Sequence, residues 1–183
     1  MSKLYLIGMP GSGKTTLGRA LAAHYGLPFV DLDAEIVSRA GQVIPAIFLT
    51  HGEAHFRRLE ADVVREVAAR PGALVLATGG GTPCFHDNGT VLAATGFTLW
   101  LDVPVPVLAA RLTATAETVS RPLLATAGPS AAWLDETLRV RKVFYAQARL
   151  RIEAATGSVA EAATRLAAAG FAPAPAAELS AGA

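Results

Sequence analysis

A glycine-rich segment near the start of the chain has the spacing of a phosphate-binding loop. Residues 8–15 read Gly-Met-Pro-Gly-Ser-Gly-Lys-Thr and fit the pattern G-x-x-x-x-G-K-[ST]. The backbone N–H groups of such a loop can surround a phosphate, and the N-terminus of the following helix adds about half a positive charge. Lys14 is expected to reach the β- and γ-phosphates of a nucleotide, and Thr15 to bind Mg²⁺. The alternative is a glycine turn with a structural role alone.

Two carboxylates lie at the end of the second apolar run, in Asp31-Leu32-Asp33. Side chains alternate along an extended segment, so both carboxylates can point toward the phosphate site. One could hold Mg²⁺ through water, and the other could accept the proton of a substrate hydroxyl. The alternative is a turn at the end of a strand, in which Asp33 caps the next helix.

Three consecutive glycines, Gly79 to Gly81, follow a third apolar run. Glycines at the end of a strand favour a place where a ligand presses against the backbone, although a flexible turn would also explain them. Arg57 lies three residues before Glu60, so the two share one face of a predicted helix. Adjacent arginines are also typical of a solvated surface, and Arg141 taken alone is unremarkable.

Other classes of nucleotide-binding protein fit the chain less well. A GTPase would need Asn-Lys-x-Asp to read guanine, and Asn88 stands in a different context. A mechanical ATPase usually has an acidic residue after an apolar strand, where this chain has its glycines. The formal net charge of +1 argues against a general nucleic-acid binder. A small-molecule kinase fits best, although a nucleotide-binding module without catalysis remains open.

The composition is that of one globular domain. The 183 residues are 52% hydrophobic and 17% charged, which is enough for a sizeable core. The single cysteine, Cys84, excludes an intrachain disulfide, and no apolar stretch is long enough to cross a membrane. We therefore expect a cytoplasmic protein that contacts neither membrane nor nucleic acid and acts as a monomer.

Apolar runs alternate with helical patterns, which predicts a parallel sheet covered on both faces. The ranges expected as strands are 3–8, 28–31, 73–78, 97–102 and 148–153. The ranges expected as helices are 14–25, 33–40, 52–70, 104–114, 131–147 and 158–169. Residues 1–169 are predicted to form a single domain, with a lid at about 115–130 that contains Arg121-Pro122. Residues 170–183, rich in alanine and proline, are expected to be a disordered tail.

The order of these motifs resembles the shikimate kinase family over roughly residues 3–168. The matching segments are the P-loop at 8–16, Asp-x-Asp at 31–33, Gly-Glu-x-x-Phe-Arg-x-x-Glu at 52–60, the glycines at 79–81, Arg-Pro-Leu at 121–123 and Arg-x-x-x-Tyr at 141–145. The resemblance implies an α/β fold: a three-layer α/β/α P-loop domain with a five-stranded parallel sheet, a helical substrate-binding region and a lid. It also implies transfer of the γ-phosphoryl group of Mg²⁺-ATP to the 3-hydroxyl of shikimate, in the biosynthesis of chorismate and the aromatic amino acids.

The resemblance further assigns a role to each site residue. The nucleotide would be bound by Gly11, Ser12, Gly13, Lys14, Thr15, Thr16, Arg111 and Arg121, with Thr15 and Asp31 serving Mg²⁺. Shikimate would be bound by Asp33, Arg57, Gly79, Gly80, Gly81 and Arg141. The catalytic groups would be Lys14, Asp33 and Arg121. A kinase for another small hydroxylated acid, such as gluconate, remains an alternative because two arginines would serve any small carboxylate.

Overall fold

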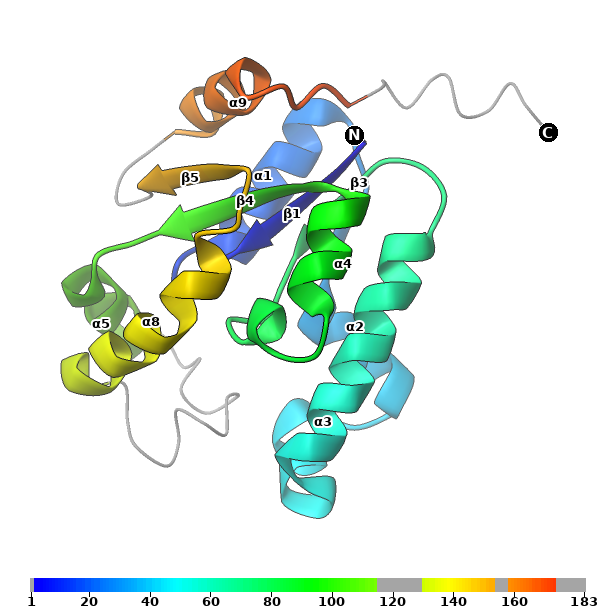
Figure 1. Ribbon diagram of the computed structural model, residues 1–183, viewed down its shortest axis with the longest axis vertical. Helices are drawn as coiled ribbons and strands as arrows, with labels where there is room; N and C mark the ends of the chain where they lie inside the picture. The colour runs from blue at the N-terminus through cyan, green and yellow to red at the C-terminus, as the bar shows by residue number, and fades with distance from the viewer. Residues whose placement is uncertain (1, 115–129, 154–157, 174–183) are drawn as a thin grey trace.

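Five apolar segments form one parallel sheet with helices on both faces (Figure 1). The computed structural model describes residues 2–114, 130–153 and 158–173. The strands are β1 (Lys3–Ile7), β2 (Phe29–Asp31), β3 (Leu74–Ala77), β4 (Phe97–Asp102) and β5 (Leu150–Glu153). Their order across the sheet is β2-β3-β1-β4-β5, and every neighbouring pair is parallel. The predicted fold class is confirmed.

The helices run between the strands and include one short 3₁₀ turn. They are α1 (Lys14–Tyr25), α2 (Leu32–Ala40), α3 (Ile44–Ala69), η1 (Thr82–Cys84), α4 (Asn88–Thr95), α5 (Val105–Ala114), α8 (Ala131–Tyr145) and α9 (Val159–Ala168). None of them, within the described part of the chain, has both the length and the hydropathy that a bilayer crossing requires.

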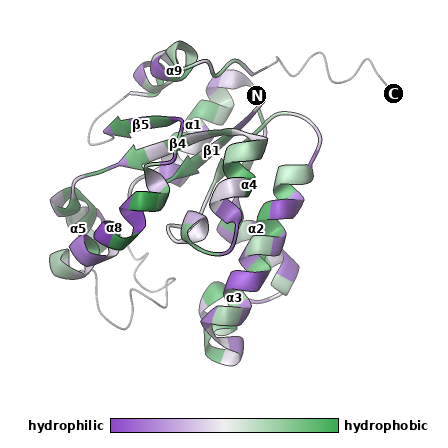
Figure 2. Ribbon diagram, in the orientation of Figure 1, coloured by the Kyte–Doolittle hydropathy of each residue, from purple (hydrophilic) through white to green (hydrophobic). Residues whose placement is uncertain are grey.

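Two hydrophobic clusters, one on each face of the sheet, form the core. Leu4 and Leu6 of β1 pack with side chains of α1 and α9. Tyr5 and Ile7, which alternate with them, pack with α3, α4, α5 and α8. This alternation is what a strand buried on both faces requires. The helices that cover the sheet, such as α3 and α8, mix hydrophilic and hydrophobic residues (Figure 2).

The helices depart from the expectation in two places. The structure contains α4, which the sequence analysis missed, and α3 begins at Ile44 rather than at residue 52. Gly52 has a φ of 78° and a ψ of 170°, so it breaks α3 into two helical parts. The φ value lies in the left-handed region that glycine adopts readily, and this made the break resemble a helix start.

Phe171 extends the ordered part of the chain beyond the expected boundary at Gly170. Its ring is 2% exposed and packs edge-on against Tyr25 and Phe97. Residues 170–173 are therefore not all part of a loose tail. The rest of the predicted tail, and the predicted lid including Arg121 up to residue 129, lie outside the described residues.

Candidate active site

The phosphate-binding loop joins β1 to α1 at the carboxyl edge of the sheet. Gly13 precedes the helix with a φ of 91°, a conformation that a residue with a side chain adopts only with strain. The Lys14 ammonium donates to the backbone oxygens of Gly8 and Met9 at 3.0 and 2.8 Å. It also lies 3.3 Å from the hydroxyl of the buried Ser12. These contacts hold a positive charge against the loop that would surround the phosphates.

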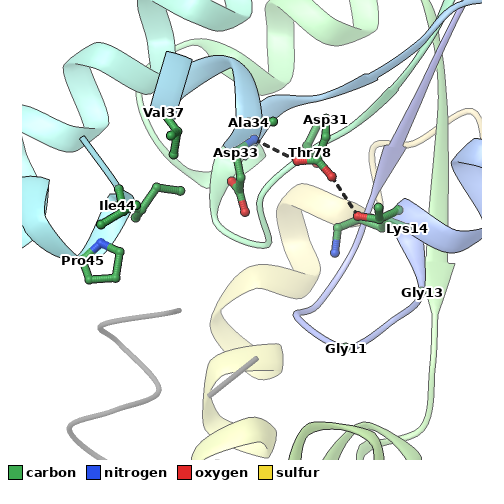
Figure 3. A pocket seen from close by; sticks show the side chains of 12 residues that line it. Gly11, Gly13, Lys14, Asp31, Asp33, Ala34, Val37, Ile44, Pro45 and Thr78 are labelled. Carbon is green, nitrogen blue, oxygen red and sulfur yellow. Dashed lines mark hydrogen bonds between the residues drawn. The ribbon is translucent and has the colours of Figure 1, made fainter. Parts of the chain in front are cut away.

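Asp31 links the phosphate-binding loop to α2. Its Oδ2 accepts a hydrogen bond from the Thr15 hydroxyl at 3.0 Å, and its Oδ1 accepts from the Asp33 backbone N–H at 3.1 Å (Figure 3). Asp31 is therefore the residue that caps α2, and the capping role considered for Asp33 is wrong. The Asp33 side chain instead lines the same cavity as Lys14.

The oxygens of Thr15 and Asp31 suit a magnesium ion. Mg²⁺ prefers hard oxygen ligands and usually takes only one or two from the protein, the rest coming from water and phosphates. The Thr15 hydroxyl, at the start of α1, lies 3.0 Å from the Asp31 carboxylate at the end of β2, and a nucleotide phosphate would bind at this helix start. Within the described ranges no cluster of three or more His, Cys, Asp or Glu residues could hold a metal ion on its own.

A cavity of about 460 Å³ opens between the phosphate-binding loop and the helices α2 and α3 (Figure 3). Its polar lining includes Lys14, Thr15, Asp31 and Asp33. Its apolar lining, which the sequence analysis missed, includes Val37, Val43, Ile44 and Pro45. Because the next helix was expected to begin at 52, Val43, Ile44 and Pro45 fell in a loop, whereas Val37 lies in the helix expected at 33–40.

The triple glycine lies against both the phosphate-binding loop and Asp33. A Cβ atom added to Gly80 would lie 2.7 Å from Cδ of Pro10, a contact that the backbone would have to move to avoid. A Cβ atom added to Gly79 would lie 3.2 Å from Oδ1 of Asp33. Close backbone approach, rather than turn flexibility, therefore explains these glycines.

Arg57 is buried beside the triple glycine and is the better placed of the two adjacent arginines. Its guanidinium donates to Glu60 at 2.8 Å and to Glu53 at 3.1 Å, and it stacks over the ring of Phe85 at 3.9 Å. A Cβ atom on Gly81 would lie 3.0 Å from Nη2 of Arg57. Arg57 is 6% exposed, whereas Arg58 faces solvent. Arg57 therefore does not belong to a solvated surface, whereas Arg58 does.

Glu60, which the sequence analysis placed on the Arg57 face without a role in the site, connects Arg57 to the glycines. It is 1% exposed, and its Oε1 accepts from the Thr82 hydroxyl at 2.7 Å. Burial raises the pKa of Glu60, and Asp33 raises it further, whereas Arg57 and Thr82 lower it. The spacing of residues in the sequence does not show that Glu60 is buried, so it could not predict that Glu60 takes part in the site. The buried Asn88 also holds this turn, donating to the Thr82 carbonyl at 3.0 Å.

Arg141 approaches the same turn from α8. It lies four residues before Tyr145 on this helix, and its charge acts to lower the pKa of the Tyr145 hydroxyl. Burial raises the pKa of Cys84 to about 11, and the charges of Arg141 and Arg57 both act to lower it. Arg57 of α3 and Arg141 of α8 therefore both act on one thiol, which stays protonated at neutral pH. The half-buried Cys84 thus suits a packing role better than a reactive one.

The other predicted nucleotide residues lie at the edge of the site. Nη1 of Arg111 donates weakly to the carbonyls of Gly11 and Ser12, both at 3.4 Å, so the side chain packs on the outside of the loop. Thr16 is exposed in the first turn of α1. The structure thus brings together, around one edge of the sheet, all the predicted site residues that it describes.

The family model for shikimate kinase matches residues 10–169. The chain belongs to the shikimate kinase family. Among curated relatives, the shikimate kinase of Synechococcus elongatus is 45% identical over 81% of this chain and 75% of its own length. The shikimate kinase of Parabacteroides distasonis is 40% identical over 84% of this chain and 88% of its own. The predicted family and enzyme class, an ATP-dependent kinase, are confirmed.

Solved structures agree with this family. Shikimate kinase from Acinetobacter baumannii, in complex with shikimate, has a TM-score of 0.82 and 37% identity over 91% of each chain. Shikimate kinase from Bacteroides thetaiotaomicron has a TM-score of 0.80, with 35% identity over 90% of this chain and 95% of that one. A gluconokinase from Sinorhizobium meliloti, 18% identical with a TM-score of 0.54, covers 92% and 90% of the two chains and shows a shared fold alone.

Proposed function

We propose that this chain transfers the γ-phosphoryl group of ATP to the 3-hydroxyl of shikimate. The observation that carries the choice of acceptor is the buried Arg57, which is held by Glu60 between Gly81 and the Phe85 ring. A buried guanidinium fork beside backbone N–H groups favours a small carboxylate. Together with Arg141, it would hold the acid group of shikimate at one end of the site.

Asp33 would act at the other end of the acceptor. Its carboxylate lines the cavity together with Lys14. A substrate hydroxyl held there would lie between this carboxylate, which can take its proton, and the phosphate site. We assign to Asp33 the orientation of the 3-hydroxyl and the acceptance of its proton as the oxygen bonds to phosphorus. The bond from phosphorus to the bridging oxygen then breaks, and ADP leaves. The apolar lining from Val37 to Pro45 would pack against the carbon ring.

The nucleotide would be held from the other side of the cavity. Gly11, Ser12 and Gly13 would present backbone N–H groups to its phosphates, and Lys14 would stabilise charge on the β- and γ-phosphates. A Mg²⁺ ion bound through Thr15, with Asp31 supporting it through water, would neutralise developing negative charge on the transferred group. Arg111 is assigned to the adenine and Thr16 to the phosphates.

Several assignments remain predictions. Arg121 is assigned to the lid, where its charge would approach the γ-phosphoryl group. All of the residues named come from one chain, so a monomer suffices for the reaction. We expect the protein to act in the cytoplasm without nucleic-acid or membrane partners, as its composition favours.

An acceptor panel tests the proposal. Release of ADP is measured with Mg²⁺-ATP and, separately, shikimate, quinate, gluconate or no acceptor. We expect turnover with shikimate alone. Turnover with gluconate or quinate instead would contradict the assignment of the acceptor but not that of the phosphate site. ADP release at the same rate with and without an acceptor would contradict the kinase reaction itself.

A further inference from the structure

Tyr145 is a buried hydroxyl that the proposed reaction does not use. It lies at the end of α8, is 0% exposed, and donates to the Gly80 carbonyl at 2.5 Å. Its oxygen also lies 3.7 Å from the sulfur of Met9 in the phosphate-binding loop. A buried tyrosine hydroxyl needs a hydrogen-bond partner, and here that partner is a backbone carbonyl of the triple glycine.

The same hydroxyl lies next to Arg141. The two residues are four apart on α8, so their side chains lie on one face of the helix. Burial raises the pKa of Tyr145 far above its ordinary value, and the positive charge of Arg141 acts in the opposite direction. The hydroxyl therefore keeps its proton and can donate it to Gly80, which leaves its oxygen lone pairs available to the Arg141 guanidinium.

The bond to Gly80 also orients the next peptide group. In a trans peptide the C=O of Gly80 and the N–H of Gly81 point in opposite directions. Because Tyr145 holds this C=O on its own side, the Gly81 N–H points away from Tyr145. The two backbone hydrogen bonds of this turn run from Thr82 N–H to Gly79 O and from Cys84 N–H to Gly81 O. Neither of them uses the Gly81 N–H as its donor.

We propose that Tyr145 is a positioning residue that sets both Arg141 and the Gly80–Gly81 peptide for binding of the acceptor carboxylate. The inference rests on the proposed function, because the carboxylate is that of shikimate. Tyr145 touches neither substrate; it acts through a guanidinium and a peptide group that do. It also ties this acceptor site to the phosphate-binding loop through Met9, and Gly80 does the same through Pro10.

The test replaces the hydroxyl alone, with Tyr145→Phe, and uses Tyr5→Phe as a matched control. Tyr5 is also 0% exposed, and its hydroxyl has a bond at 3.2 Å to Thr95, the last residue of α4, which has no part in the reaction proposed above. We expect Tyr145→Phe to raise the KM for shikimate about tenfold, the loss typical of one well-formed buried hydrogen bond, while the KM for ATP changes less than about twofold. Tyr5→Phe should leave both KM values unchanged.

A double-mutant cycle asks whether the effect passes through Arg141. In an Arg141→Gln background, Tyr145→Phe should raise the KM for shikimate much less than it does alone. Full additivity, an unchanged KM in Tyr145→Phe, or an equal rise in both KM values would each overturn the inference. Turnover of shikimate by the wild-type enzyme is measured first, since its absence would overturn the proposed function rather than the role of Tyr145.

A second measurement needs no folded Tyr145 variant. The wild-type enzyme is labelled with ¹³Cζ-tyrosine, and its three tyrosine signals are assigned from Tyr5→Phe and Tyr25→Phe. Addition of shikimate should shift the Tyr145 signal, because the bound carboxylate offsets the electric field of the arginine that lies beside its hydroxyl. A Tyr145 signal that stays in place at saturating shikimate would overturn the inference.

Discussion

Arg57 has its binding geometry set by neighbours before any acceptor arrives. Glu60 and Glu53 accept from its guanidinium, and the Phe85 ring lies under its plane. A fork held in this way loses little side-chain entropy when it binds a carboxylate. Spacing could predict that Arg57 and Glu60 share a helix face. It could not predict which of Arg57 and Arg58 points inward, because that depends on what α3 packs against.

Replacing Arg57 by lysine tests the fork without removing the charge that balances Glu60. Arg57→Lys should raise the KM for shikimate more than tenfold, because a lysine cannot bind a carboxylate in the bidentate geometry. The KM for ATP should change less than about twofold. Steady-state kinetics check both values, and Arg58→Lys serves as the exposed control. An equal loss of ATP affinity would show that Arg57 is misassigned.

Glu60 should make the stability of the enzyme depend on pH. Its pKa is raised in the folded state, mainly by burial, so the unfolded chain gives up this proton first as pH increases. The stability that Glu60 contributes is then fully present below the ordinary glutamate pKa and is lost as pH rises through the folded value. Glu60→Gln, which stays neutral, should escape this loss.

Chemical unfolding of wild type and Glu60→Gln across this pH window provides the measurement. The free energy of unfolding of wild type should fall relative to that of the variant as pH rises from about 4. A difference that stays constant, or one that changes in favour of wild type, would mean that the Arg57 charge outweighs the cost of burying Glu60.

Among the elements, α2 is the one whose start carries two functions. Asp31 caps the helix through one carboxylate oxygen and contacts Thr15 through the other. The cap fixes the direction of the first turn, which is where Asp33 lies. The sequence placed both aspartates at the strand end, but the division between cap and acceptor group depends on the backbone angles of Asp31, which alternation alone does not define.

Two substitutions at Asp31 separate the cap from the charge. Asp31→Asn keeps an oxygen that can cap α2, so the free energy of unfolding should stay close to that of wild type, whereas Asp31→Ala should lose about 1 kcal/mol. Both variants should need more Mg²⁺ for half-maximal activity. Ser158→Ala, which removes the cap of α9, should lose similar stability at unchanged Mg²⁺ dependence. A normal Mg²⁺ dependence in Asp31→Asn would contradict the metal assignment.

Sequence patterns did not predict α4 or the first part of α3, and each omission has a physical reason. The segment Asn88–Thr95 is short and mixes small and apolar residues all round, so it lacks the periodicity that predicts α4. The first part of α3 is hidden by Gly52, whose break resembles a helix start. By contrast, α1 and β4 have the bounds that their patterns predict.

For the whole molecule, the order of the strands decides which motifs meet. The central β1 carries the phosphate-binding loop, with β3 and then β2 on one side of it. The glycines that follow β3 and the aspartates that end β2 therefore lie next to each other, and α8 brings Arg141 from beyond β4. A parallel sheet and a site at its carboxyl edge could be predicted from the alternating pattern. The order of the strands could not, because local periodicity contains no information on which strands pair.

The measurement that tests this arrangement most directly is turnover by Asp33→Asn. The substitution keeps the shape of the side chain and removes its charge, so shikimate and ATP should bind with nearly wild-type dissociation constants. The kcat should fall more than tenfold, because the hydroxyl loses the group that orients it and accepts its proton. Asp135→Asn, at an exposed position on α8, serves as the control. An unchanged kcat in Asp33→Asn would contradict the account of how this site transfers a phosphoryl group.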